Sequence, residues 1–142
     1  MKIKQCATDE YLQLQKISIE NNKINKGNLG YTFFEMINLL TLKYNIEPLV
    51  IKLINEEYDL IGYAIFYFSD SDTIQISQIC LKRKYQNNNY ASYLITELKQ
   101  DAAKITADIA KDNIQSQNFF IKEGFSIEEV EDSKRYRAIF KH

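Results

Sequence analysis

The residues most suited to chemistry in this sequence form one short cluster of cations and side-chain amides. The segment reads LKRKYQNNNYA over residues 81–91, so three cations, residues 82–84, precede three consecutive asparagines, residues 87–89. Asparagine adopts left-handed backbone angles more readily than most residues that carry a side chain. A loop that bends closely around an anion can therefore be built from asparagines. The cluster predicts a phosphate-binding site.

The position of the cluster between two apolar segments supports this prediction. A strand that turns through a short loop into a helix leaves backbone N–H groups free at the helix start, with the positive end of the helix dipole behind them. That geometry binds phosphate. A plain solvated turn is the alternative, because asparagine is abundant throughout the sequence. The phosphate loop of ATPases is excluded, since no Gly-Lys-Ser/Thr follows.

Length and composition indicate one globular domain, residues 1–142, with 45% hydrophobic and 26% charged residues. The net charge of −1 indicates no broad basic face for nucleic acid. Cys6, Cys80 and a single histidine, His142, are too few for a metal cluster or a disulfide framework. The amino terminus lacks the apolar stretch of a signal peptide, and no segment approaches the about 20 apolar residues of a membrane span. We expect a cytoplasmic protein that holds no metal and binds neither nucleic acid nor membrane.

The first half of the chain is predicted to contain a strand, two helices and a meander. Thr8 is the expected cap of the first helix, which runs to Asn22. Thr32 and Glu35 have the spacing of a capping box at the start of the second helix, and Pro48 prevents that helix from continuing. Short apolar runs rich in β-branched and aromatic residues then predict antiparallel strands. The predicted strands are 2–7, 49–54, 60–68 and 73–81, and the predicted helices are 8–22 and a segment from residue 33.

The second half is predicted to alternate helices and strands. Apolar residues recur every three or four positions from Ala91 to Ala102, which indicates an amphipathic helix directly after the loop. Asp112 or Asn113 can cap a further helix, and Gly124 stands where a left-handed residue would close it. The remaining predicted strands are 105–110, 126–130 and 136–140.

Two motifs resemble the GNAT acetyltransferase superfamily. That family carries an apolar residue and, five positions on, Arg/Gln-x-x-Gly-x-Gly/Ala at a helix start, where the pyrophosphate of acetyl-CoA binds. Here Leu81 takes the apolar position, Gln86 the Arg/Gln position and Ala91 the last one, while Asn89 replaces the first glycine. A second block, NIQSQNFFIKEGF at residues 113–125, resembles the family helix that begins with Asn and ends in Gly-Phe. The order of the predicted elements is also similar along most of the chain.

The resemblance implies a fold and a set of binding residues. The fold class is α/β (α+β), a single GNAT-like domain with a mixed, mostly antiparallel sheet of six or seven strands and about four helices. Acetyl-CoA is the implied co-substrate, with its pantetheine in an opening beside the strand before the loop. Asn113 is implied to bind pantetheine, although helix capping explains this residue equally well. The implied CoA-binding residues are Ile79, Cys80, Leu81, Gln86, Asn87, Asn88, Asn89, Tyr90, Ala91, Ser92, Asn113 and Phe120.

The resemblance also implies catalytic roles. The N–H of Leu81 would polarise the thioester carbonyl. Asp108 stands at the position of the general base in members that acetylate protein amino termini, and an exposed strand carboxylate is the alternative interpretation. Many members protonate the leaving thiolate with a tyrosine, but that position here is Phe120. A thiolate leaving group costs ~2 kcal/mol near pH 7, whereas deprotonation costs ~4.6 kcal/mol for a lysine amine and about 1 for an α-amino group. We therefore expect an acceptor amine of low pKa.

The sequence thus predicts an N-acetyltransferase that moves an acetyl group from acetyl-CoA to a primary amine, either a small molecule or a protein amino terminus, by direct attack in a ternary complex. Its partners would be acetyl-CoA and the amine, and the protein would be a monomer or a homodimer. Acceptor recognition is expected from residues 25–34 and from the stretch around Tyr136. Phe120 supports one alternative, an acyl-CoA-binding module without catalysis. The cations at 82–84 support another, a nucleic-acid-binding domain.

Overall fold

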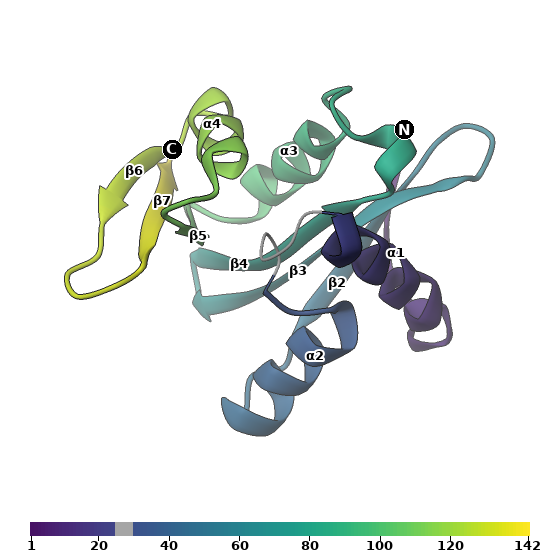
Figure 1. The fold of residues 1–142 in the computed structure, drawn as a ribbon, viewed down its shortest axis with the longest axis horizontal. Helices are drawn as coiled ribbons and strands as arrows, with labels where there is room; N and C mark the ends of the chain where they lie inside the picture. Colours follow the sequence, from purple (N-terminus) through teal and green to yellow (C-terminus); the bar gives the residue numbers. More distant parts are fainter. Residues whose placement is uncertain (25–29) are drawn as a thin grey trace.

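One seven-stranded sheet forms the centre of the computed structural model, which describes residues 1–24 and 30–142 and the side chains outside 22–29. The strand order is β1-β2-β3-β4-β5-β7-β6, and only β4 and β5 pair in parallel. Helices α1 and α2 lie on one side of the sheet and α3 and α4 on the other (Figure 1). The strands are β1 (Lys2–Gln5), β2 (Leu49–Ile54), β3 (Leu60–Asp70), β4 (Thr73–Leu81), β5 (Lys104–Ala110), β6 (Ser126–Glu129) and β7 (Arg135–Lys141); the α-helices are α1 (Tyr11–Ile24), α2 (Phe33–Asn38), α3 (Ala91–Asp101) and α4 (Ile114–Lys122). The predicted fold class is confirmed, with seven strands and four α-helices among the described residues.

Capping contacts explain where the first two helices begin. A 3-10 turn, Thr8–Glu10, leads into α1, and its cap is Ala7, whose N–H donates to the Glu10 carboxylate. The prediction that Thr8 is the cap is wrong, because Thr8 is already the first residue of the helical turn and the N–H that Glu10 accepts belongs to Ala7. The capping box before α2 is confirmed, since Thr32 Oγ1 accepts the Glu35 N–H and Glu35 Oε1 accepts the Thr32 N–H.

Helix α2 continues into a π-helical turn, Leu39–Lys43, which the sequence pattern did not predict. The Tyr44 N–H donates to the Leu39 carbonyl, five residues back, at 3.2 Å. The segment then ends at Asn45, whose φ of 53° is left-handed, so the helical backbone stops before Pro48 rather than at it. The extra residue in the turn shifts the side chains that follow, and single π turns of this kind are frequent at functional sites.

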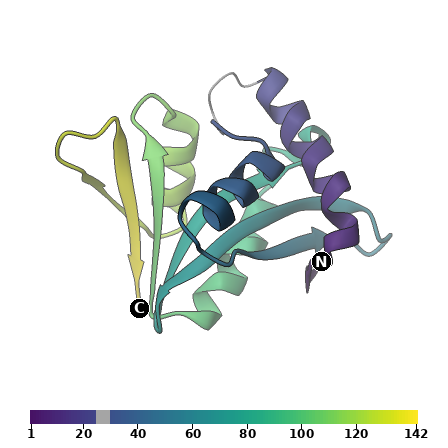
Figure 2. The ribbon, with the colours of Figure 1, turned by 90° about the horizontal axis from the view of Figure 1, so that it is seen from below.

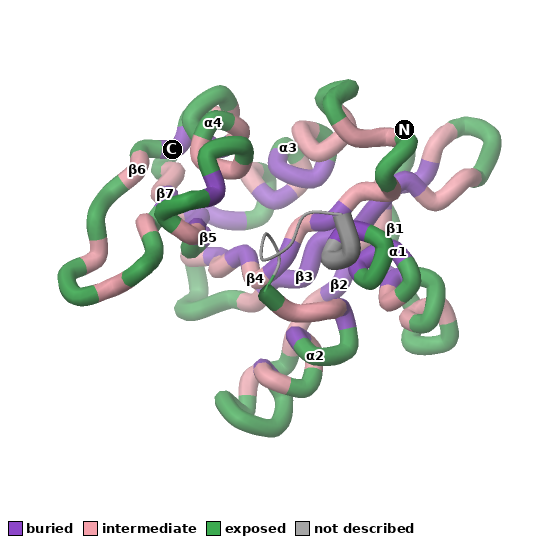
Figure 3. The backbone as a smooth tube through the Cα atoms, in the orientation of Figure 1, coloured by how far each residue is buried: buried purple, intermediate pink, exposed green. Residues whose placement is uncertain are grey.

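The two faces of the sheet bury separate apolar clusters. Every second residue of β4 is buried, but these residues divide between the two faces of the sheet. Ile76 packs with Leu98 on the α3 face, whereas Cys80 packs with Tyr63 and Phe33 on the face that α1 and α2 cover. Figure 3 shows buried residues concentrated on these central strands. Among the described residues, none of the helices has both the length and the apolarity needed to cross a membrane.

Strands β4 and β5 separate along their length. Their parallel pairing covers only four positions, from Thr73 opposite Lys104 to Ile76 opposite Ala107. On the other side of β4, Ile65 pairs with Gln78 but Phe66 pairs with Ile76, so Ser77 is the extra residue of a bulge. A bulge bends and twists the strand that carries it, and the divergence begins at this residue. Figure 2 shows β4 and β5 meeting at one end and diverging toward the other.

Candidate active site

A cavity of about 860 Å³ occupies the place where β4 and β5 diverge. Its walls come from residues 75–81 of β4, residues 107–110 of β5, the loop before α3, one face of α4, and the segment from α2 through the π turn. Two of the sequence-predicted residues, Asn88 and Ser92, lie outside the lining. The structure brings the others together there: Ile79, Cys80, Leu81, Gln86, Asn87, Asn89, Tyr90, Ala91, Asp108, Asn113 and Phe120.

The end of β4 presents backbone groups to this cavity. Leu81 pairs with Gly62, and the Lys82 N–H donates to the Ile61 carbonyl at 2.8 Å. Hydrogen-bonded and non-hydrogen-bonded pairs alternate in an antiparallel ladder, so the N–H and C=O of Leu81 and Ile79 point away from β3. They point to the side from which β5 has diverged, and an extended ligand can bond there as an added strand.

Two side-chain amides hold the last carbonyl of β4. Asn21 Nδ2, from α1, donates to the Leu81 carbonyl at 2.9 Å and to the Ile17 carbonyl at 3.0 Å. Gln86 Nε2 donates to the same Leu81 carbonyl at 3.2 Å and also to Asn21 Oδ1. Both side-chain N–H groups of Gln86 are thus committed to the strand end rather than directed at an anion. Asn21 is buried, and the sequence reasoning missed it because no local pattern relates a residue of α1 to the loop.

The loop between β4 and α3 contains two left-handed asparagines, as the sequence analysis expected of an anion-binding loop. The φ angles of Asn87 and Asn89 are 66° and 62°. Among the described residues, the backbone N–H groups of residues 87–91 have no hydrogen-bond acceptor, and the lining includes all of these residues except Asn88. Five successive free amides before a helix are suited to oxygen atoms that carry negative charge.

Lys122 adds a cation to this end of the cavity. Its Nζ donates to Asn89 Oδ1 at 2.7 Å, and Lys122 itself lines the cavity from the last turn of α4. The asparagine that stands in place of a glycine therefore also anchors a positive charge over the loop. The pattern of the loop alone did not point to Lys122, because 33 residues separate the two partners.

Asn113 and Phe120 form the α4 side of the cavity. Asn113 is the N-cap of α4, since its Oδ1 accepts the Ser116 N–H at 3.1 Å. This cap uses the oxygen and leaves the Nδ2 donor of a cavity-lining side chain for another partner. Phe120 is buried and stacks edge-on against Phe119 and Phe125, so no hydroxyl is available at this position.

Asp108 lines the cavity next to Ile76 and Ala107, the last paired residues of β4 and β5, away from the loop that follows Leu81. It is exposed on β5, and its Oδ1 accepts a hydrogen bond from Arg137 Nε of β7 at 3.2 Å in an ion pair. Tyr67 lines the same end of the cavity. Burial, followed by the negative charge of Asp108, raises the pKa of Tyr67, so this phenol stays protonated near neutral pH.

Cys80 lies on the strand that lines the cavity, but its thiol is not a nucleophile. The side chain is buried, and its Sγ lies 3.9 Å from the Ile17 carbonyl. Burial raises the pKa of the Cys80 thiol to about 12, so the reactive thiolate is absent at neutral pH. This agrees with the alternation along β4, which places Cys80 on the face opposite Leu81.

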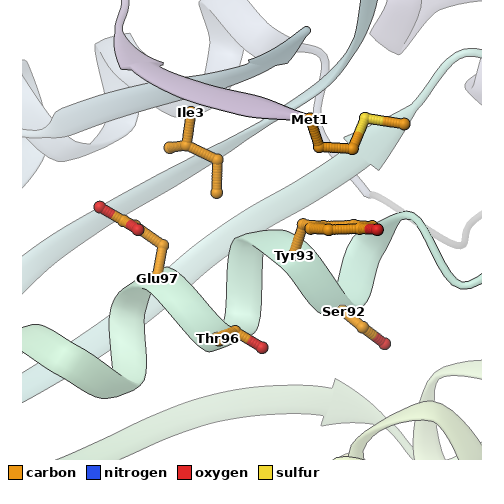
Figure 4. A pocket seen from close by; sticks show the side chains of 6 residues that line it. All are labelled: Met1, Ile3, Ser92, Tyr93, Thr96 and Glu97. Atoms are coloured by element: carbon orange, nitrogen blue, oxygen red, sulfur yellow. The ribbon is translucent and has the colours of Figure 1, made fainter. Parts of the chain in front are cut away.

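Ser92 faces a different hollow. A smaller cavity of about 370 Å³ lies between the first residues of the chain and α3, and Figure 4 shows Ser92 there with Met1, Ile3, Tyr93, Thr96 and Glu97. The Ser92 hydroxyl donates to the Glu123 carboxylate at 3.0 Å, and its N–H donates to the Asn89 carbonyl. The free amides of the loop therefore end at Ala91.

Comparison with known proteins gives one family and one recurrent fold. The acetyltransferase (GNAT) family matches residues 20–125 of the chain, while no curated protein sequence gives a match. A PaiA N-acetyltransferase from Thermoplasma acidophilum in complex with coenzyme A superposes with a TM-score of 0.73 at 15% identity, over 99% of this chain and 98% of that one. A GNAT-family acetyltransferase from Staphylococcus aureus gives 0.71 at 16% identity, over 99% of each chain. A variant SpeG spermidine N-acetyltransferase from Vibrio cholerae gives 0.70 at 13% identity, over 99% and 92%.

Proposed function

The chain belongs to the acetyltransferase (GNAT) family, and from this premise we propose that it transfers an acetyl group from acetyl-CoA to a primary amine. The observation that carries the proposal is the opening between β4 and β5, which ends at five free loop amides. Acetyl-CoA has an extended pantetheine arm that ends in a charged pyrophosphate, so it matches both parts of the opening.

The polar groups of the cavity fit this co-substrate. The N–H groups of residues 87–91 and the Lys122 ammonium would hold the pyrophosphate, because they are the donors at that end. The outward N–H and C=O groups of Ile79 would pair with the amides of pantetheine, whereas the Leu81 carbonyl is already held by Asn21 and Gln86. Asn113 Nδ2 would donate to a pantetheine carbonyl while Oδ1 remains on the helix cap. Gln86, in this proposal, positions the strand end and does not touch phosphate.

The proposed reaction is direct attack of a neutral amine on the thioester carbonyl carbon. A C–N bond forms, the C–S bond breaks, the sulfur keeps the electron pair, and the amine loses a proton. The Leu81 N–H would donate to the carbonyl oxygen as negative charge develops on it. Asp108 would receive the proton through its Oδ2, since Oδ1 is bonded to Arg137. With Phe120 in place of an acid, the CoA thiolate takes its proton from water, and the proton that Asp108 received neutralises the hydroxide that remains.

Turnover with a panel of amines tests this proposal. Release of free CoA thiol is followed at pH 7 with small amines and with peptides that have free amino termini. Amines of low pKa should turn over faster than lysine side chains, because a lysine amine costs ~4.6 kcal/mol to neutralise and an α-amino group about 1. Rapid acetylation of lysine side chains, without activity on the other amines, would contradict the proposal.

A binding module without catalysis is the second candidate function, and the specific observation that favours it is Phe120. Thermal unfolding with acetyl-CoA separates the two functions, since a ligand that binds only the folded state raises Tm. A higher Tm together with no thiol release from any amine supports the module. A higher Tm with thiol release supports the transferase.

A further inference from the structure

The acceptor end of the cavity, which is the part near Asp108 where the amine would bind, combines an apolar wall with few charged side chains. Away from the loop, one wall comes from β3 and from residues 31–46, which include α2 and the π turn, and this wall is apolar or aromatic. The side chains that form it are Tyr31, Met36, Leu39, Tyr44, Ile46 and Tyr67. The adjoining part of β4 contributes the neutral polar residues Gln75, Ser77 and Gln78. Walls of this kind bind the apolar part of a ligand, and a few polar groups fix its orientation.

Negative charge at this end is limited to one residue. Within the described part of the chain, Asp108 is the only carboxylate in the cavity lining, and it is already paired with Arg137. Arg135 adds a cation to the lining. Of the stretch 25–34 expected to recognise the acceptor, residues 25–29 lie outside the described residues. The described part of the site can thus hold one ammonium group, but it offers no carboxylate to a second.

The tyrosines do not replace the missing carboxylates. The phenol of Tyr67 stays neutral, because burial and Asp108 raise its pKa. An additional ammonium group would lose water against neutral side chains and would approach Arg135. Burial of a charge without a partner is unfavourable, whereas burial of an aliphatic or aromatic group against this wall is favourable.

We infer that the acceptor is a monoamine whose only other large group is apolar or aromatic, and not a polyamine. The inference rests on the proposed function for the place of the acetyl group, and it adds the class of acceptor. The amine would lie beside Asp108, and the apolar group would lie against Leu39, Tyr44 and Tyr67. The same chemistry is found in small arylalkylamines and in peptides that begin with a bulky apolar residue.

Three amines test the inference on the wild-type protein. Ethanolamine provides a small amine whose pKa is close to that of phenethylamine, phenethylamine adds an aromatic group, and spermidine adds further positive charges. We expect kcat/KM for phenethylamine to exceed that for ethanolamine at least tenfold, with spermidine no better than ethanolamine. Comparison of phenethylamine with a short peptide that begins with phenylalanine shows whether the site prefers a small arylalkylamine or a peptide amino terminus. Spermidine as the best of the three substrates would overturn the inference.

A matched pair of variants tests the role of the wall. Leu39→Glu places a carboxylate on a half-buried cavity position, and Leu42→Glu places one on the same helical segment at a residue that is 81% exposed and outside the lining. Leu39→Glu should raise the ratio of spermidine to phenethylamine turnover at least tenfold, while Leu42→Glu should leave it unchanged. An unchanged ratio in folded Leu39→Glu would refute the inference.

Binding separates this inference from the proposed function. Calorimetry of the three amines with protein saturated by CoA gives the same ranking without any turnover. Phenethylamine binding at least tenfold tighter than spermidine supports the apolar acceptor site even if no amine is acetylated, in which case only the proposed function fails. Spermidine binding that equals or exceeds phenethylamine binding overturns the inference whether or not transfer occurs.

Discussion

Replacing Asn21 with alanine removes three hydrogen bonds that hold the end of β4 to α1 and to the loop. Its side chain donates to the carbonyls of Leu81 and Ile17 at 2.9 and 3.0 Å and accepts a bond from Gln86. A neutral hydrogen bond contributes about 1 kcal/mol net, so the three bonds contribute ~3 kcal/mol. Because alanine is a better helix former than asparagine, the substitution also stabilises α1 by about 0.6 kcal/mol. Because Gln86 keeps its own bond to the Leu81 carbonyl, we expect a net loss of about 2 kcal/mol in the free energy of unfolding.

The same substitution should change catalysis as well as stability. The proposed oxyanion donor is the Leu81 N–H, which lies one peptide unit before the Leu81 carbonyl that Asn21 holds. Loss of one such donor costs about 10²- to 10³-fold in kcat. Asn21→Ala loosens the end of β4 without removing the Leu81 N–H, so we expect a loss in kcat of roughly tenfold with the KM for the amine unchanged. A residue that only supports the fold would lower stability and leave kcat of the folded protein unaltered.

Urea unfolding and steady-state kinetics measure the two effects on one preparation. Asn38→Ala is the matched control, because Asn38 ends α2, is exposed and makes no side-chain hydrogen bond among the described residues. Because alanine is the better helix former, Asn38→Ala should leave the free energy of unfolding unchanged or raise it by no more than about 0.6 kcal/mol. If Asn21→Ala unfolds at the same urea concentration as wild type, or keeps the full kcat, the role assigned to Asn21 is wrong.

Three further predictions concern the loop and the buried thiol. Lys122→Met should weaken CoA binding at least about tenfold, as loss of one charge-assisted hydrogen bond implies, and leave pantetheine binding unchanged in calorimetry. Lys111→Met replaces an exposed lysine outside the cavity lining and should have no effect. Equal loss for both ligands would contradict the assignment. Asn89→Gly should keep CoA affinity within about threefold. Asn89→Val should lower the free energy of unfolding by about 1–2 kcal/mol, because a β-branched residue is strained at the φ of 62°. Equal unfolding midpoints for the two variants would argue against this strain. Burial raises the pKa of the Cys80 thiol from 9.0 to about 12, so the folded state favours the protonated thiol. The contribution of Cys80 to the free energy of unfolding is therefore lost as pH rises from 9 towards 12. In urea titrations between pH 8 and pH 10.5 the free energy of unfolding should decline less steeply for Cys80→Ala than for wild type, and parallel declines would refute this.

Local sequence patterns predicted helix ends and left-handed backbone positions. The capping box before α2 follows from two side chains three residues apart, and the left-handed Gly124, with a φ of 92°, follows from its place after a helix. The left-handed angles of Asn87 and Asn89 follow from the kind of residue that tolerates them. Such features depend on a few neighbouring residues, so a single sequence contains the information.

Other features depend on contacts between distant segments. The bulge at Ser77 results from the register between β3 and β4, and a strand of alternating apolar residues does not reveal it. The π turn after Asn38 shifts a wall of the cavity by one residue. Asn21 and Lys122 act through partners 60 and 33 residues away. Their roles emerge only when the chain is folded.

Backbone NMR during titration with CoA is the most direct measurement of the anion site. In ¹⁵N-labelled protein, the amide resonances of residues 87–91 should shift on addition of CoA, together with those of Ile79 and Leu81. The resonances of the turn between β6 and β7, far from the loop, should stay in place. Saturating CoA that moves no resonance in residues 87–91, or that moves only those of another surface, would contradict the account.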